Sequence, residues 1–377
     1  MPRLLPRVLH HARKIDPLLP LVLQATRDLA SAKNELRWLK EFVIEQQSRH
    51  PKHDDRKVLD QRLRQVCIDR ARGKPLQYIM GSEYFGDLEI SCEKGVLIPR
   101  QETATSVTHL IILLHHSSNN KTKTPLPNNL KLLDLCTGTG CIPLLSHYLF
   151  TSIHKRKAEN LEVVGVDISP LALKLAKKNL QNLIAEGTIQ KKPNLRFLQA
   201  DVLSSTDGHG DAAIPSLKSA LEHYNFTSDL AGSGKSSWDI IISNPPYISP
   251  QAFARTTTRS VKRYEPRLAL VPPYTASDKD TNQGDLFYPH LLSIAASHSA
   301  KIVLFEVADL QQAIRVSAMA IHQNIWDGIQ IWRDDPMAAE TVGDTALDGK
   351  VKVVGQGHGR SVVVYRGVGK QWLGVED

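Results

Sequence analysis

The sequence predicts an α/β protein in which an open sheet flanked by helices follows a small helical domain. Four apolar runs between residues 131 and 243 are each followed by polar residues, as expected for buried strands that end at a ligand-binding edge. A glycine-containing turn joins the first of these runs to an apolar helical stretch. Nearer the amino terminus, apolar residues recur at helical spacings. A chain of 377 residues is long enough for about two or three structural units.

Composition bounds the possible functions only loosely. A net charge of +8 is compatible with a nucleic-acid or ribosome-associated partner, and equally with a protein of an alkaline organelle. The four cysteines show no metal-ligand spacing, so we predict no metal site and a reducing compartment. No apolar run has the length needed to cross a bilayer, and we expect no membrane contact.

Residues 1–17 have the features of a mitochondrial transit peptide. Arginines are interspersed with leucines here, and no acidic residue precedes Asp16. Acid-free, arginine-bearing, amphipathic starts of this kind direct proteins to mitochondria, so we predict a location in the mitochondrial matrix. The alternative is an irregular basic tail, because Pro2, Pro6 and Pro17 disfavour a helix.

Residues 18–75 are predicted to form the helical domain. Leu29, Leu36 and Leu39 fall on one helical face, and Pro51 interrupts the pattern. A second helix follows and ends near a glycine and a proline. The apolar stripe is expected to be the core of this domain.

The rest of the chain is predicted to be a linker and the main domain. Short apolar runs bounded by glycines predict a β-hairpin linker over residues 76–99. The main domain is expected over residues 100–377, beginning with a helix and a polar loop at residues 115–129. Residues 204–237 are poor in periodicity and rich in Gly, Ser and Asp, and they predict a partly disordered insertion.

Polar groups follow four predicted strands in succession. The strands cover residues 131–136, 161–166, 195–198 and 238–243, and they are followed by Thr137 to Gly140, Asp167, Asp201 with Val202, and Asn244. A glycine turn allows close approach of a ligand, and a carboxylate at the next strand end can accept ribose hydroxyls. Together these positions predict a nucleoside-containing cofactor across the carboxyl edge of the sheet. Strands at residues 301–305, 329–332 and 361–365 complete it, the last two as an antiparallel pair.

The tetrapeptide Asn244-Pro245-Pro246-Tyr247 is the most informative of these segments. Two prolines cannot continue a sheet, so the chain must leave it at this edge. The Asn244 amide oxygen and the Pro245 carbonyl can together accept both N–H bonds of a primary amide or amine, and the Tyr247 ring can cover its flat face. The segment therefore predicts a site that orients an –NH2 group.

Three blocks of the sequence resemble the HemK/PrmC family of S-adenosylmethionine-dependent methyltransferases. They run from Pro75 to Arg100, from Leu133 to Gly140, and from Asn244 to Tyr247 with Tyr264-Glu265-Pro266 downstream. The resemblance implies a class I methyltransferase fold, a Rossmann-like seven-stranded sheet behind a helical amino-terminal domain that recognises the substrate. It also implies methylation at N5 of the glutamine in the Gly-Gly-Gln loop of a peptide-chain release factor.

The resemblance assigns roles to individual residues. Catalytic roles fall on Asn244, Pro245, Pro246 and Tyr247, which would hold the glutamine side chain. S-adenosylmethionine would be bound by Asp134, Thr137, Gly138, Thr139, Gly140, Asp167, Asp201, Val202 and Asn244. The expected partner is a mitochondrial release factor; we expect a monomer and no direct contact with nucleic acid.

Three positions depart from the family pattern. Cys136 stands where the loop usually has its first glycine, and we expect it to be tolerated if its backbone φ stays negative. Gln101 replaces a proline, and Ala104 replaces an acidic residue. These two changes raise the question of what the segment after Arg100 contributes.

Three other functions stay open. One is a small-molecule methyltransferase, which the helical amino-terminal domain disfavours because it suggests a macromolecular substrate. N6-adenine methyltransferases of DNA or RNA use the same tetrapeptide on an exocyclic amine, where Tyr247 could stack on a flipped base. A binding protein could keep the fold and use the cofactor site without catalysis. The block from Pro75 to Arg100 favours the release-factor enzymes, and intact Asn244 and Asp167 favour catalysis.

Overall fold

A computed structural model describes residues 4–49, 56–118, 124–153, 155, 160–204, 214–227, 237–273, 283–338 and 344–375. Its internal contacts divide the chain into two compact units. Unit 1 comprises Met1–Ser82, Cys92–Lys94 and Thr257–Glu265, and unit 2 comprises the remainder.

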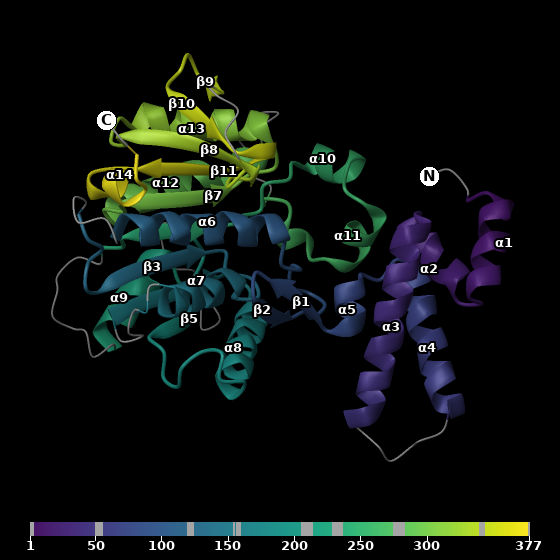
Figure 1. Cartoon of the computed structure of the whole chain (residues 1–377). Helices are drawn as coiled ribbons and strands as arrows, with labels where there is room; N and C mark the ends of the chain where they lie inside the picture. Colours follow the sequence, from purple (N-terminus) through teal and green to yellow (C-terminus); the bar gives the residue numbers. More distant parts are fainter. Residues whose placement is uncertain are drawn as a thin grey trace. The chain divides into compact units, whose positions relative to one another are not determined.

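Unit 1 is a small helical domain (Figure 1). Its helices are α1 (Pro6–Ile15), α2 (Leu19–Thr26), α3 (Leu29–Arg49), α4 (Arg56–Ala71), α5 (Leu76–Met80) and α11 (Arg259–Tyr264). The predicted stripe forms its core, where Leu36 and Leu39 of α3 pack with Leu19, Leu23 and Cys67. An ion pair between Arg70 and Glu35, with Nε and Oε2 2.6 Å apart, joins α4 to α3.

Helix α1 lies in the segment predicted to be a transit peptide. Pro6 occupies its first turn, where the missing N–H has no partner to lose, so the proline does not prevent the helix. Ala12 is fully buried in the core of unit 1, and Leu4, Val8 and Leu9 pack around it. The segment thus has a packing role in this unit, and its removal in the mature protein stays a prediction.

Unit 2 is built on a nine-stranded sheet in the order β5-β4-β3-β6-β7-β11-β8-β10-β9. The strands are β3 (Leu130–Leu135), β4 (Leu161–Asp167), β5 (Leu195–Gln199), β6 (Ile240–Ser243), β7 (Ile302–Glu306), β8 (Gly328–Asp335), β9 (Thr345–Ala346), β10 (Val351–Val354) and β11 (Gln356–Tyr365). The first five in the order are parallel to one another, and β11 runs antiparallel to both β7 and β8. The seven predicted strands and the antiparallel pair are confirmed.

The predicted number of strands was too low by the two at one edge. β10 pairs in parallel with β8, and β9 pairs antiparallel with β10. Both lie in the long connection between β8 and β11. Strand β10 is only Val351 to Val354, too short for its alternation to be distinguished from a loop.

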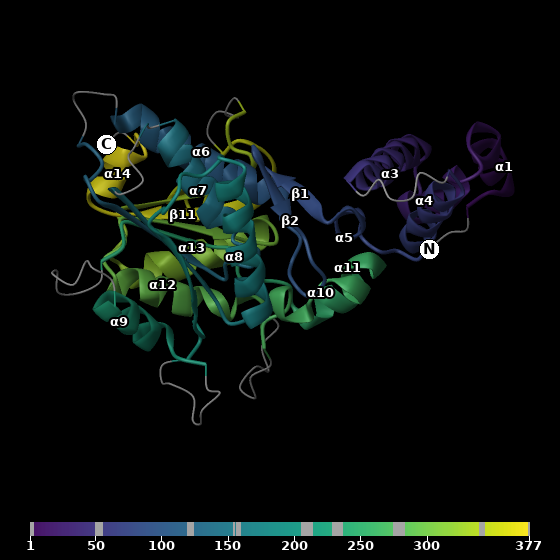
Figure 2. The same ribbon diagram turned by 90° about the horizontal axis from the view of Figure 1, so that it is seen from below.

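Helices cover both faces of the sheet (Figure 2). On one side lie α6 (Gln101–Ser118), α7 (Cys141–Ser152), α8 (Pro170–Ala185) and α14 (Val368–Trp372), and on the other α9 (Leu217–Thr227), α12 (Phe287–Ser297) and α13 (Leu310–Gln323). Alternate residues of β3 enter the two cores, Leu132 on the first side and Leu133 and Leu135 on the second. This doubly covered sheet explains why its strands are apolar in succession.

Three local predictions need correction. The insertion contains helix α9, whose Leu217 and Leu221 are buried in the core, so this part is ordered; residues 205–213 and 228–236 lie outside the described residues. The linker is a hairpin only over β1 (Ser82–Phe85) and β2 (Leu88–Ser91), and α5 precedes it. Helix α6 continues to Ser118, beyond the predicted start of the loop.

Three shorter elements connect the strands near the predicted site: α10 (Pro250–Arg255), η2 (Arg267–Ala269) and η3 (Gln283–Asp285). Among the described helices, none combines the length and apolar character that crossing a membrane requires.

Candidate active site

The parallel pairing aligns the predicted polar groups at one edge of the sheet. Leu135 at the end of β3 pairs with Val166 of β4 and Ser243 of β6, and Ser243 also pairs with Phe305 of β7. The residues that follow these strands are therefore neighbours in space. The prediction that these strands end side by side at one edge of the sheet is confirmed.

A cavity of about 240 Å³ opens at this edge of unit 2. Six residues assigned to cofactor or substrate line it: Gly138, Asp167, Asp201, Val202, Asn244 and Pro246. The cavity wall also includes residues that carried no prediction: Val96, Leu97, Ile168, Pro266, Leu268, Phe287 and others near them. Asp134, Thr137, Thr139, Gly140, Pro245 and Tyr247 lie outside this lining.

Asp167 connects the glycine turn to helix α8. Its Oδ2 accepts a hydrogen bond from the Gly138 backbone N–H at 2.8 Å, and its Oδ1 accepts one from the Ser169 N–H at 2.8 Å. Each carboxylate oxygen keeps a second lone pair, so the side chain can still accept ribose hydroxyls from the cavity that it lines. Burial raises the pKa of Asp167, an effect that the backbone N–H groups oppose.

Asp134 is the most unusual group behind the turn. Its side chain is 0% exposed, and neither carboxylate oxygen has a hydrogen-bond partner in the described structure. Burial raises its pKa well above the ordinary value. An unpartnered buried carboxylate is costly, and a cation bound beside it would relieve that cost.

Gly140 serves the packing of the turn. Its φ is +78°, and an added Cβ would come within 2.9 Å of Ala176 Cβ and of the Phe197 ring. Glycine is therefore required for the start of α7 to approach α8 and β5. Thr139 is likewise held from α8, since Asn179 Nδ2 donates to its carbonyl at 3.0 Å.

Cys136 does not meet the condition of a negative φ on which its tolerance was expected to depend. Its φ is +67°, in the left-handed region where only glycine is free of strain. Cys136 therefore keeps the backbone shape of the usual glycine, at a conformational cost of about 1–2 kcal/mol. Its side chain lines the cavity and packs against the core beneath it.

The polar ends of the tetrapeptide are bound by two buried residues. Asn244 Nδ2 lies 3.4 Å from Thr103 Oγ1 of α6, and Tyr247 OH donates to Glu306 Oε1 of β7 at 3.0 Å. The Thr103 hydroxyl also donates to Glu306 Oε2. Tyr247 is thus held through its hydroxyl. The stacking role of its ring stays a prediction.

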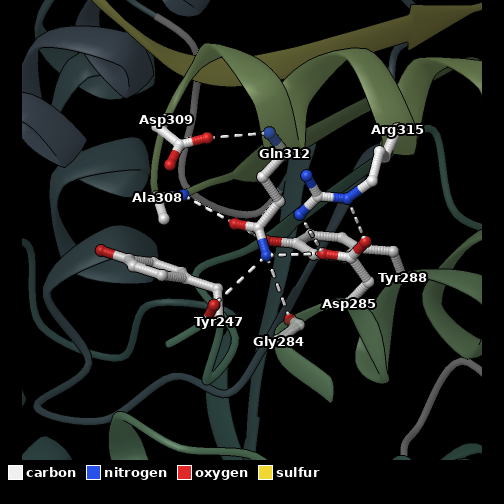
Figure 3. A network of polar contacts seen from close by, with 8 residues as sticks. All are labelled: Tyr247, Gly284, Asp285, Tyr288, Ala308, Asp309, Gln312 and Arg315. Carbon is white, nitrogen blue, oxygen red and sulfur yellow. Dashed lines mark hydrogen bonds and ion pairs between the residues drawn. The ribbon is translucent and has the colours of Figure 1, made fainter. Parts of the chain in front are cut away.

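The backbone after the tetrapeptide is held from α13 (Figure 3). Gln312 Nε2 lies 3.2 Å from the carbonyl oxygens of Tyr247 and Gly284 and 2.8 Å from Asp285 Oδ1. The Gln312 side-chain oxygen accepts from the Ala308 N–H at 2.8 Å. Arg315 binds both oxygens of Asp285 at 2.6 and 2.9 Å. This buried network fixes where the chain turns after leaving the sheet.

Two relatives of known designation cover most of the chain. The Schizosaccharomyces pombe protein named "Probable MRF1 mitochondrial N(5)-glutamine methyltransferase mtq1" is 35% identical over 84% of this chain and 89% of its own length. The Saccharomyces cerevisiae protein named "Mitochondrial MRF1 N(5)-glutamine methyltransferase MTQ1" is 34% identical over 72% of this chain and 68% of its own length. The chain belongs to the N5-glutamine methyltransferase family.

Two more distant likenesses concern the methyltransferase fold. The sequence model of the family described as Eco57I restriction-modification methylase matches residues 162–289 of this N5-glutamine methyltransferase family member, from β4 past the tetrapeptide. A solved S-adenosylmethionine-dependent methyltransferase from Agrobacterium tumefaciens is 15% identical, covers 76% of this chain and 69% of its own, and has a TM-score of 0.36. Neither adds to the family assignment.

Sequence patterns missed several residues of this N5-glutamine methyltransferase site. Glu306 directly follows the predicted strand at residues 301–305, so the rule that identified the other strand ends would have found it had the rule been applied to this strand as well. Thr103, Gln312 and Asp285 carry no such signal. The departures after Arg100 also have an account: Gln101 donates to the Tyr84 carbonyl of the hairpin, and Ala104 is buried in the core.

Proposed function

We propose that this chain transfers a methyl group from S-adenosylmethionine to the amide nitrogen of the glutamine in the Gly-Gly-Gln loop of a mitochondrial release factor. The observation that carries the proposal is the place of Asn244. It lines the same cavity as Asp167 and Asp201, and it directly precedes the two prolines of the tetrapeptide. The residues proposed for cofactor and acceptor therefore share one cavity lining, which supports the proposal.

The residues present fit S-adenosylmethionine. Asp134 lies behind the cavity wall, and its buried carboxylate, without a hydrogen-bond partner by geometry among the described residues, would favour the cofactor's ammonium group at that wall. Asp167 offers spare lone pairs for ribose hydroxyls. Asp201 and Val202 line the same cavity and would flank the adenine. When bound, the cofactor supplies an electrophilic methyl group on a sulfonium.

The chain's own task is to orient a weak nucleophile. An amide nitrogen reacts poorly because its lone pair is delocalised. The Asn244 side-chain oxygen and the Pro245 carbonyl can accept the two N–H bonds of the glutamine amide and so hold its nitrogen toward the methyl group. Orientation of this kind contributes several kcal/mol, about 7–11 in the best cases. No residue is required to remove the proton beforehand, since it can leave after transfer.

The relatives support the proposed substrate and location. Both are named for the mitochondrial factor MRF1. The basic, acid-free stretch before Asp16 supports import into the matrix, where residues 1–17 would act as transit peptide. Unit 1 is suited to recognise a macromolecular substrate, and we propose that the chain acts as a monomer.

The deciding experiment is methyl transfer from labelled S-adenosylmethionine. A mitochondrial release factor, its variant with Ala in place of the loop glutamine, and a duplex DNA are offered in parallel. Label on the unaltered factor alone is the expected result. Label on both factors would mean that another residue accepts the methyl group. If no label is transferred although the cofactor still binds, the chain is a binding protein without this catalytic activity.

One observation supports a second candidate. The restriction-modification methylase match extends over β4, β5 and the tetrapeptide, the parts that an adenine methyltransferase would share. Label on the DNA in the same experiment would establish that function. The match covers only residues 162–289, whereas the yeast relatives extend over most of the chain.

A further inference from the structure

Two buried polar residues beside the tetrapeptide have no part in the mechanism above. Thr103 lies in the first turn of α6 and is 6% exposed, and Glu306 ends β7 and is 5% exposed. Together they connect both polar ends of the Asn-Pro-Pro-Tyr segment, since Thr103 contacts Asn244 and Glu306 contacts Tyr247. These four residues form a series of hydrogen bonds, and the donor in each bond determines which way the Asn244 amide faces.

The donors and acceptors in this series can be assigned by starting from the Glu306 carboxylate. A carboxylate has no proton to donate, so both hydroxyls that reach it must donate: Thr103 to Oε2 and Tyr247 to Oε1. A threonine hydroxyl has one proton. Once that proton is given to Glu306, the Thr103 oxygen can only accept from its other neighbour.

That other neighbour is the side-chain amide of Asn244. Because Thr103 Oγ1 must accept, the amide has to present its NH2 group to it, and Nδ2 lies 3.4 Å away. The carbonyl oxygen of the amide then points away from Thr103. Asn244 lines the cavity, so its oxygen is the atom left to meet the acceptor substrate.

We propose that Glu306 and Thr103 are positioning residues that set the Asn244 amide with its oxygen toward the substrate and hold the Tyr247 ring through its hydroxyl. The inference rests on the proposed function, because only a substrate that donates N–H bonds needs an oxygen at this position. A reversed amide would offer its NH2 group to another NH2 group and could not hold it.

The surroundings of Glu306 fix its position and act on its pKa in opposite directions. Tyr288 OH donates to the Glu306 backbone carbonyl at 2.8 Å, which fixes the end of β7. Burial raises the pKa of Glu306, whereas the hydrogen bonds from Thr103 and Tyr247 and the positive charge of Arg360 oppose the rise. Arg360 is itself held by Asp334, with Nε and Oδ1 2.9 Å apart.

The first test compares Thr103→Val with Thr103→Ser. Valine has nearly the shape of threonine but leaves the amide orientation unset, while serine keeps the hydroxyl. We expect Thr103→Val to lower kcat for the release factor by about 10–100-fold, with the Kd for S-adenosylmethionine unchanged, and Thr103→Ser to restore most of the rate. Thr105→Val is the matched control, because within the described part of the chain the Thr105 hydroxyl donates only to the Gln101 carbonyl of its own helix, at 3.0 Å.

The second test compares Glu306→Gln with Glu306→Asp. Glutamine has the size of glutamate, but its NH2 group would force one hydroxyl to accept. If that hydroxyl is Thr103, the Asn244 amide reverses; if it is Tyr247, the ring loses its acceptor. Aspartate is shorter but remains acceptor-only. We expect Glu306→Gln to lose more kcat than Glu306→Asp, the opposite of the order expected if only packing mattered.

The outcomes separate this inference from the proposed function. If the unaltered protein does not label the release factor, the proposed function fails. If it does, and Thr103→Val turns over like Thr105→Val or fails to bind the cofactor, the positioning role is overturned. Equal losses for Thr103→Val and Thr103→Ser would also overturn it. Should the Glu306 variants not fold, the Thr103 pair decides alone.

Discussion

Cys136 carries backbone strain at the centre of the cofactor turn. Its φ of +67° is one that glycine adopts freely and a side chain does not. We expect Cys136→Gly to be more stable than Cys136→Ala by about 1 kcal/mol, because both lose the sulfur but only alanine keeps the strain. Urea unfolding of the two variants measures the difference. Equal midpoints would mean that the turn relaxes around a Cβ without cost.

Asn244 and Asp167 line one cavity but should fail in different ways. Asn244→Ala removes the acceptor for the substrate amide, so we expect no measurable turnover with cofactor affinity reduced less than about tenfold. Asp167→Ala removes the ribose acceptor and the contacts to Gly138 and Ser169, so cofactor affinity should fall by more than tenfold, about 1.4 kcal/mol or more. Calorimetry with S-adenosylmethionine and single-turnover methylation separate the two. Retained turnover in Asn244→Ala would contradict its assigned role.

Among single residues, those that closely follow a strand could be predicted from the sequence. Asp167, Asp201 and Asn244 could be located because a strand end places the next side chain at the edge whatever the rest of the fold does. Thr103 could not be located in this way. It meets Asn244 across 141 positions of sequence, and only the packing of α6 on the sheet brings the two together.

Helix α13 controls the active-site loop through one side chain. Gln312 is 3% exposed and binds the Tyr247 and Gly284 carbonyls together with the Ala308 N–H. Gln312→Met keeps the volume but leaves these backbone groups unpartnered, at an expected cost of about 2–4 kcal/mol in the free energy of unfolding and a lower kcat. The control is Gln311→Met, on the exposed face of the same helix, which should change stability by less than about 0.5 kcal/mol. Thermal unfolding and turnover of the pair test the role; equal behaviour would refute it.

Among the elements, the seven strands were predictable because each is buried on both faces and hence continuously apolar. The elements that were missed owe their structure to neighbours. Strand β10 is ordered by its pairing with β8, and α9 by the burial of Leu217 and Leu221 against the sheet. Their local sequences carry too short or too weak a pattern to show this in advance.

At the scale of the whole molecule, each of the two units has its own core, and the cavity belongs to unit 2. Unit 2 contains every residue that lines the cavity, and it contains the hydrogen-bonded residues Thr103, Asn244, Tyr247 and Glu306. The pairing of its parallel strands aligns the strand ends at one edge of the sheet. Unit 1 has its own core and its own ion pairs, so the cofactor cavity does not need it for its walls. Substrate recognition by unit 1 stays a proposal.

The stability of the molecule should depend on pH through buried histidines. His147 of α7 is 0% exposed, and neither of its ring nitrogens has a hydrogen-bond partner among the described residues. His109 of α6 stands edge-on to Trp332, with their ring centroids 4.6 Å apart. Burial lowers the pKa of each from its ordinary 6.5 to about 4. Both are therefore neutral in the folded chain at a pH where the unfolded chain has bound protons.

The sign of the effect follows from that difference. The stabilisation is fully present above pH 6.5 and is lost as the pH falls from 6.5 toward about 4, by up to about 3 kcal/mol for His147. His147→Leu should flatten the fall in the free energy of unfolding between pH 7 and 4.5, and the double variant with His109→Phe should flatten it further. Urea unfolding across this range measures the slopes. A slope unchanged in both variants would show that other groups govern the acid sensitivity of the fold.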